Sequence, residues 1–254
     1  MQTKGFECAI HSDNIVGKHF KWSATLVRAG NWDKIVELQR DAQGNKLDDI
    51  SNSWIIGGPT NAYFDYKVIG VWQTHEAEEA AKYKAVPGDA KIYDKTGDGK
   101  IGADDRMVIG SKAPRWTAGL TNNFQYKNIS LSFFFNSSFG AWHKNETIKY
   151  ERQLFEKNVN YLSDIDYWTV DNPSNKYPRL GYSNATYNFY KKVNFVRLQD
   201  VNLAYHFPKS ILNKVGLKEL TTYINGRNLF TWSNANKYTT NVEQETYSLD
   251  STGF

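Results

Sequence analysis

The chain has 254 residues, of which 15% are aromatic, and its mean hydropathy is -0.62. It contains no run of about 20 consecutive apolar residues, which excludes a bundle of transmembrane helices. The 31 basic and 27 acidic residues are mixed along the chain and give a formal net charge of +4, so no basic run indicates nucleic-acid binding. The single cysteine, Cys8, excludes an internal disulfide framework and a multi-thiolate zinc site.

Alternating polar and apolar residues predict a series of antiparallel strands. The predicted strands, in chain order, are 6–11, 20–27, 116–126, 129–136, 201–207 and 220–227. The run at 129–136 is the clearest case, because its odd positions are apolar and its even positions are mainly Ser and Asn. A membrane barrel and a soluble sandwich both require strands with one apolar face. The alternation therefore predicts an all-β chain and leaves these two architectures open.

The connections between the predicted strands differ sharply in length. Short connections are predicted at 13–19, 127–128 and 208–219. Long connections are predicted at 28–115, at 137–194 and from 233 onward. The first of these is expected to carry extra strands near 54–56 and 63–72 and a short helix at 76–83. Short turns at one end and long loops at the other are typical of outer-membrane barrels.

An acidic stretch from 94 to 105 fits the twelve-residue calcium-loop template. Oxygen ligands are predicted on Asp94, Thr96, Asp98, the carbonyl group of Lys100, Asp104 and Asp105. Thr96 and Asp105 depart from the residues that the template prefers at their positions, so a solvated Asp/Gly turn without metal stays open. A bound calcium ion is expected to be structural rather than regulatory, because no paired helices flank the stretch.

Extended outward, this stretch is part of an ordered series of motifs. They are Pro87-Gly88-Asp89, Ile92-Tyr93-Asp94, Pro114-Arg115-Trp116, Lys176-Tyr177-Pro178-Arg179, Phe195 to Val201 and Asn225 to Trp232. In this order the series resembles the C-terminal half of SusC/RagA-type TonB-dependent outer-membrane transporters of the Bacteroidetes. The resemblance covers nearly the whole chain, which makes it far more specific than any single motif.

The resemblance implies a transmembrane antiparallel β-barrel of roughly 22 strands with long extracellular loops. Residues 1–254 would supply about six to eight of these strands, with the plug domain and the final strand absent. The implied function is import of oligosaccharides or peptides across the bacterial outer membrane. Its implied partners are TonB, which contacts the missing N-terminal part, and a SusD-like surface lipoprotein that acts as a lid.

Two kinds of residue follow from this interpretation. The apolar strand faces are expected to contact lipid, and the opposite faces, with Arg197, Gln199 and Arg227, are expected to line the lumen. Aromatic side chains in the long loop are candidates for contact with substrate. These are Trp142, Tyr161, Tyr167 and Trp168.

The alternative from another class is a soluble, secreted, calcium-stabilised β-sandwich that binds glycans. A hydrolase with paired carboxylates has candidates in Glu76, Glu78, Asp164 and Asp166, but all four lie in polar stretches that resemble loops. The chain is therefore not expected to be an enzyme.

Overall fold

A computed structural model describes residues 1–145, 166–182, 188–235 and 246–247. Six long strands dominate it. They are β1 (Gln2–Val16), β2 (Phe20–Lys34), β9 (Trp116–Tyr126), β10 (Ile129–Asn145), β11 (Tyr190–His206) and β12 (Thr221–Ser233). All five pairings along the order β1-β2-β9-β10-β11-β12 are antiparallel, and the short β13 (Thr246–Tyr247) pairs in parallel with the end of β10. Among the described residues, no helix is long and apolar enough to cross a membrane.

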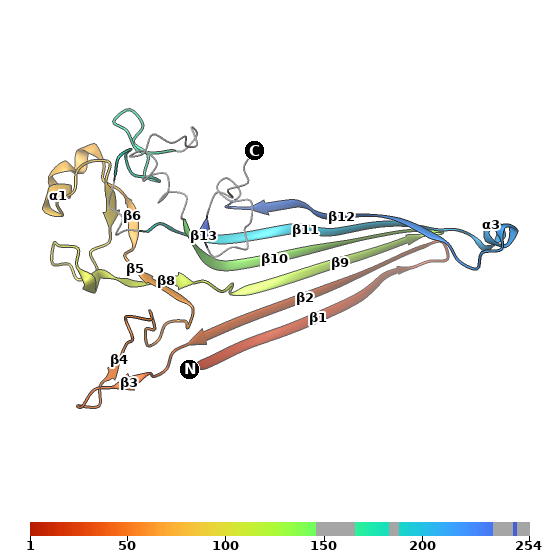
Figure 1. Ribbon diagram of the computed structural model, residues 1–254, viewed down its shortest axis with the longest axis horizontal. Helices are drawn as coiled ribbons and strands as arrows, with labels where there is room; N and C mark the ends of the chain where they lie inside the picture. Colours follow the sequence, from red (N-terminus) through yellow and green to blue (C-terminus); the bar gives the residue numbers. More distant parts are fainter. Residues whose placement is uncertain (146–165, 183–187, 236–245, 248–254) are drawn as a thin grey trace.

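The two ends of this sheet differ, as Figure 1 shows. At the turn end, residues 17–19 and 127–128 make tight connections, and 207–220 hold only α3 (Lys209–Leu212) and the 3-10 turn η3 (Asn213–Val215). At the loop end lie the connections that hold the small strands and α1 (Ala77–Lys82). The predicted asymmetry of the connections is confirmed. So is the reversal at 127–128, where Lys127 takes the left-handed conformation with φ 51°.

Strand pairing assigns each side chain of the sheet to one of two faces, because residues directly opposite each other point to the same side. The apolar face carries Ile10, Leu26, Leu120, Phe124, Leu131, Phe133, Val201, Leu203, Ile224 and Phe230. The polar face carries Glu7, His11, Lys21, Asn123, Ser132, Asn202, Asp200, Arg197 and Arg227. Six strands in register therefore separate polar from apolar side chains over most of the sheet, with Lys4, Arg28 and Lys34 on the apolar face near the loop end.

The apolar face is uncovered. Leu203, Ile224 and Phe230 are 45%, 75% and 61% exposed. A soluble sandwich would bury these side chains under a second sheet about 10 Å away. No such sheet covers them in the described part of the chain, so the described residues do not form the sandwich that was the alternative. An apolar surface of this extent requires an apolar partner.

One polar group on the apolar face is satisfied within the sheet. Asn122, which is 9% exposed, accepts a hydrogen bond at 3.0 Å from the indole N–H of Trp22 on the neighbouring strand. The Trp22 ring also stacks on Phe124, with ring centroids 5.7 Å apart. The amide oxygen is therefore hydrogen-bonded where an unpaired one would be costly.

The simple alternation fails at one point of β11. Phe134 pairs with Asp200 and Phe135 with Leu198, so Gln199 is an extra residue in a bulge. The same irregularity appears on β12, where Asn228 has φ 52°. The bulge keeps Leu198 on the apolar face and Arg197 on the polar face. Because Gln199 has no cross-strand partner, pairing does not assign it to a face, and its expected place on the polar face with Arg197 stays a prediction.

The first long loop, 35–115, folds into small elements. They are β3 (Gln39–Arg40), β4 (Lys46–Leu47), β5 (Ala62–Asp65), β6 (Val68–Val71), η1 (Thr74–Glu76), α1, β7 (Ala90–Ile92), η2 (Ala103–Asp105) and β8 (Met107–Ser111). The predicted strand at 63–72 is divided into β5 and β6, and the predicted helix is confirmed as η1 followed by α1. The predicted strand at 54–56 is wrong, because Trp54 makes only an isolated bridge to Asp49.

The first long loop packs against the described part of the second, 166–182 and 188–189. Ala90 and Ile92 of β7 form a buried cluster with Tyr182 and Phe189. Polar contacts join the same segments: the backbone N–H of Val71 donates to Oδ1 of Asn175 at 2.7 Å. We call this two-loop structure the loop layer. It gives the loop end of the sheet a hydrophobic core of its own.

Candidate functional site

The acidic stretch forms a compact loop beside α1 in which the carboxylates bind backbone N–H groups. Asp105 is only 1% exposed and accepts hydrogen bonds from the N–H groups of Lys95, Thr96 and Gly102, at 3.0, 3.0 and 2.7 Å. Asp94 accepts from the N–H groups of Gly97 and Gly99, at 2.6 and 2.9 Å. These contacts hold the turn closed through its own peptide groups.

The electrostatics of the loop follow from these contacts. Burial alone would raise the pKa of Asp105, but hydrogen bonds from Gly102, Thr96 and Lys95 outweigh it and hold the pKa below its usual value. Asp98 accepts from the N–H of Lys100, and Asp104 is exposed. In the described part of the chain, no three acidic, His or Cys side chains are arranged to hold a metal ion. Calcium binding by this loop stays a prediction.

The predicted substrate contacts lie in different surroundings. Trp168 is 7% exposed, and its indole N–H donates to Oε1 of Gln73 at 3.1 Å, so it joins the two long loops. Tyr167 makes a parallel bridge to Tyr177 within the second loop. Tyr161 lies outside the described residues. Only Trp142, which is half-buried at the end of β10, lines a large cavity.

That cavity, of about 1020 Å³, lies at the loop end where β2 and β9 separate. The ladder between these strands ends at the pair Gly30 and Trp116, after which the N–H of Asn31 donates to the carbonyl of Arg115 at 3.2 Å. Beyond this point β8, which leads into β9, pairs with β5 instead of β2. The separation of the strands leaves a hollow between β2 and β8, which we call the loop-end pocket.

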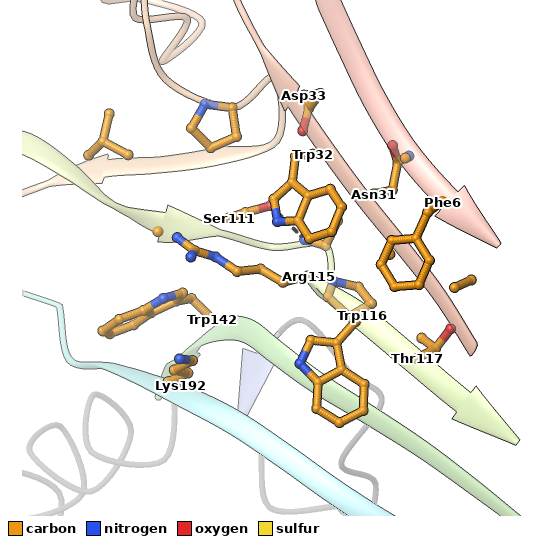
Figure 2. Close-up of a pocket in the computed structure, with 18 of the residues that line it drawn as sticks. Phe6, Asn31, Trp32, Asp33, Ser111, Arg115, Trp116, Thr117, Trp142 and Lys192 are labelled. Atoms are coloured by element: carbon orange, nitrogen blue, oxygen red, sulfur yellow. Dashed lines mark hydrogen bonds between the residues drawn. The ribbon is translucent and has the colours of Figure 1, made fainter. Parts of the chain in front are cut away.

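Figure 2 shows the side chains around the loop-end pocket. Its aromatic lining comes from Phe6, Trp32, Trp116 and Trp142, and its polar lining includes Asn31, Asp33, Ser111, Arg115 and Lys192. The indole of Trp142 packs closely against Gly110 of β8. A Cβ atom at Gly110 would come within 2.1 Å of the ring. A pocket of this volume with aromatic faces, two cations and an amide can hold a chain-like polar ligand by stacking and hydrogen bonds.

Sequence reasoning missed most of the loop-end pocket. Asn31, Arg115 and Lys192 are far apart in the chain, and only the register of β2 on β9 and of β10 on β11 brings them together. The one available signal was Pro114-Arg115-Trp116, whose proline interrupts the alternation immediately before a strand. It marks the place where β8 ends and β9 begins.

The carboxylates considered for a hydrolase have structural partners. Glu76 accepts a hydrogen bond from Lys91 at 2.6 Å, which lowers its pKa. Hydrogen bonds from Lys176 and Asn172 lower the pKa of Asp166 to about 2. Glu78 is exposed on α1, and Asp164 lies outside the described residues. Glu76 and Asp166 therefore lack the raised pKa that a general acid needs at neutral pH.

Comparison with known proteins agrees with this geometry. No protein-family model matches the chain. TonB-dependent receptor P26 of Formosa agariphila is 30% identical over 248 residues, covering 92% of this chain and 25% of that protein. TonB-dependent receptor P3 of the same organism is 28% identical over 246 residues, covering 92% and 24%. The chain thus spans about a quarter of the length of these relatives.

Solved structures show the same fold. The structure of the RagAB peptide transporter matches 91% of this chain and 26% of its own, with a TM-score of 0.66 and 20% identity. The RagAB peptide importer in the open-open state matches with a TM-score of 0.65 and 21% identity. The described sheet is therefore the kind of antiparallel sheet found in outer-membrane receptors. The chain corresponds to part of a SusC/RagA-type TonB-dependent receptor, and the resemblance predicted from its motifs is confirmed.

Proposed function

We propose that this chain forms part of the wall and the extracellular loops of an outer-membrane importer that takes up oligosaccharides or peptides with energy supplied through TonB. In this proposal residues 1–254 are the C-terminal part of the barrel. The apolar face contacts lipid, the polar face lines the lumen, and the loop end lies outside the cell.

One observation carries the proposal: polar and apolar side chains are separated across all six long strands while the apolar face stays uncovered. The strands have 11 to 17 residues. A tilted strand needs about 9–11 residues to cross the hydrocarbon core, so each is long enough. In lipid, the exposed Leu, Ile and Phe side chains are surrounded by hydrocarbon instead of water, which is favourable for apolar groups.

The loop-end pocket is the proposed place of substrate contact. Trp142 offers a ring on which a sugar or an aromatic side chain can stack, and Arg115 offers a donor for a carbonyl or carboxylate group. Both oligosaccharides and peptides carry these groups. RagAB is a peptide transporter, which makes peptides the first substrates to test.

The loop layer is the proposed docking surface for a SusD-like lipoprotein. It has its own buried cluster and ion pairs, such as Arg179 Nε with Asp89 Oδ1 at 2.9 Å, so it holds a fixed shape. A lid that opens and closes over the lumen needs such a stable base at the extracellular end.

The test is uptake by cells that carry the full-length receptor or lack it. Labelled peptides and labelled oligosaccharides of graded size are supplied with and without a protonophore that removes the energy source. The proposal expects uptake that needs both the receptor and energy, and that falls about tenfold in Trp142→Ala if one stacked ring contributes about 1.4 kcal/mol. Uptake that does not depend on the receptor for either ligand class would contradict it.

A further inference from the structure

The charge that the apolar face carries is of one sign. Every acidic residue of the six long strands lies on the polar face: Glu7, Asp13, Asp33 and Asp200. On β1 and β2, the apolar face carries Lys4, Arg28 and Lys34. All three lie in the half of the strands nearest the loop end. The apolar face is therefore bordered by positive charge at that end.

Arg28 is held between aromatic rings rather than by a carboxylate. Its guanidinium carbon lies 5.5 Å from the ring centroid of Phe6 and 4.9 Å from that of Trp116. Within the described residues, no carboxylate forms an ion pair with Arg28, Lys4 or Lys34, and all three side chains are exposed. Their donors are available to an anion from outside the chain.

The rings between these charges form a flat platform. Phe6 and Trp32 stack with centroids 5.9 Å apart and planes 22° apart. Gly30 makes this possible, since a Cβ atom there would come within 2.7 Å of Phe6 and 2.8 Å of Trp32. Cross-strand pairing places Arg28 opposite Cys8 and Lys4 opposite Trp32, on either side of the platform. Arg28 and Trp32, the partner of Lys4, lie about 13 Å apart along β2 at about 3.3 Å per residue.

We propose that this basic-aromatic platform (Lys4, Phe6, Arg28, Trp32, Lys34 and Trp116) binds the phosphate-bearing headgroup of a lipid in the outer leaflet of the membrane. Aromatic rings favour the boundary between hydrocarbon and headgroups, and basic side chains beside them attract anionic lipid. The inference rests on the proposed function, because it requires the apolar face to lie in the membrane with the loop end outside.

The experiment uses the full-length receptor in nanodiscs that contain equal amounts of phosphatidylglycerol and phosphatidylcholine. After release from the nanodiscs, native mass spectrometry measures the ratio of the two lipids that remain bound. Arg28→Gln is expected to lower the retained share of phosphatidylglycerol about fivefold, and the Lys4→Gln/Arg28→Gln variant is expected to lower it further. Lys21→Gln is the matched control, because Lys21 is an exposed lysine of β2 on the polar face at the turn end.

Folding is checked by the mobility of the unheated protein on denaturing gels, and Lys4→Gln alone serves if Arg28→Gln fails this check. Equal lipid ratios in the native protein and the double variant overturn the inference, and so does an equal loss in Lys21→Gln. Displacement of the lipid by excess inorganic phosphate would indicate a free-anion site instead. If the native receptor does not import either ligand class but the platform variants still lose phosphatidylglycerol selectively, only the proposed function is contradicted.

Discussion

At the scale of single residues, two carboxylates of the loop layer, Asp105 and Asp166, act as internal caps. Asp105 closes the acidic loop, and Asp166 binds Asn172 and Lys176 in the second long loop, with its carboxylate 2.7 Å from the Lys176 ammonium group. Each organises a turn of polar residues that has little apolar surface to bury. Charge-assisted hydrogen bonds therefore hold these two turns in one conformation, since apolar packing contributes little to them.

Asp105→Ala is expected to loosen the acidic loop by about 3 kcal/mol, because three backbone N–H groups lose a buried acceptor. Hydrogen exchange of amides 94–105 in the full-length receptor measures the change. Asp104→Ala is the matched control, because the Asp104 carboxylate is next to Asp105 in the sequence but is exposed. Equal acceleration in both variants would show that Asp105 does not cap the loop.

The calcium prediction is separable from this capping role. If the loop binds calcium, the thermal midpoint of the full-length receptor rises with added calcium, and Asp98→Ala removes the rise. Asp98 suits this test because only the N–H of Lys100 donates to it in the described structure. An unchanged midpoint in saturating calcium leaves the loop as a turn closed by its own peptide groups.

The contact of Asp166 with Lys176 is expected to depend on pH in the acidic range. The pKa of Asp166 is about 2 in the folded chain and lies below its usual value of 3.8. A depressed pKa stabilises the fold above about pH 4, and this contribution is lost as the pH falls through 4 towards 2. Pepsin cleavage within 166–182 should therefore increase across this window, and Asp166→Asn should remove the pH dependence. A native profile as flat as that of the variant would contradict the assignment.

At the scale of elements, the sequence predicted what local alternation encodes. The limits of β9 and the turn at 127–128 agree with the structure. The predicted β10 stopped at 136, because Ser137 and Ser138 follow Asn136 and hide the alternation that continues to Asn145. The Gln199 bulge was missed for a similar reason, since an extra residue shifts the pattern without a Gly or Pro to mark it.

The candidate site was less predictable than the strands. Trp142 was found because it is aromatic and close to a strand end, but its partners in the loop-end pocket depend on strand register and on where β2 and β9 separate. Trp168 shows the converse: an aromatic residue in a long loop was taken as a substrate candidate, but it is buried between the loops. Composition identifies such side chains, and only packing decides their exposure.

Gly88 is expected to be a point on which the loop layer depends. It has φ 91°, and a Cβ atom there would lie 2.5 Å from Trp168 and 2.7 Å from Arg179. Gly57 has φ 88° in the same long loop, with nothing within 4 Å of such an atom. Both alanine variants carry the backbone cost of about 1 kcal/mol, and Gly88→Ala adds a clash of about 1–3 kcal/mol.

Limited proteolysis of the full-length receptor distinguishes these variants. Gly88→Ala should expose the described part of the second long loop to cleavage, because Trp168 and Arg179 lose their fit against the first loop. Gly57→Ala should resemble the native protein more closely. If the two variants are cleaved alike, backbone strain alone accounts for the effect, and the contact between the loops does not depend on Gly88.

At the scale of the whole molecule, this chain combines a sheet of long antiparallel strands with a folded loop layer at its loop end. Two connections join the sheet to the loop layer. One is where β8 leads into β9, and the other is at Phe189, which directly precedes β11 and packs in the buried cluster of the loop layer. Tyr190, at the start of β11, donates to Asp65 of β5 at 2.6 Å and fixes that junction. In the proposed importer, a change in the lumen would reach the extracellular surface through continuous strands rather than through flexible linkers.

The orientation of the sheet leads to the last prediction, made on the neighbours Asn202 and Leu203 in β11. Asn202 lies on the polar face opposite Ser132, and Leu203 lies on the apolar face opposite Leu131. Asn202→Cys and Leu203→Cys, each in a Cys8→Ser background, are labelled with an environment-sensitive fluorophore in the full-length receptor. Brominated lipid should quench the label at 203 and leave that at 202 unaffected, because only lipid contact allows quenching. Equal quenching at both positions, or quenching only at 202, would overturn the assignment of the apolar face to the membrane.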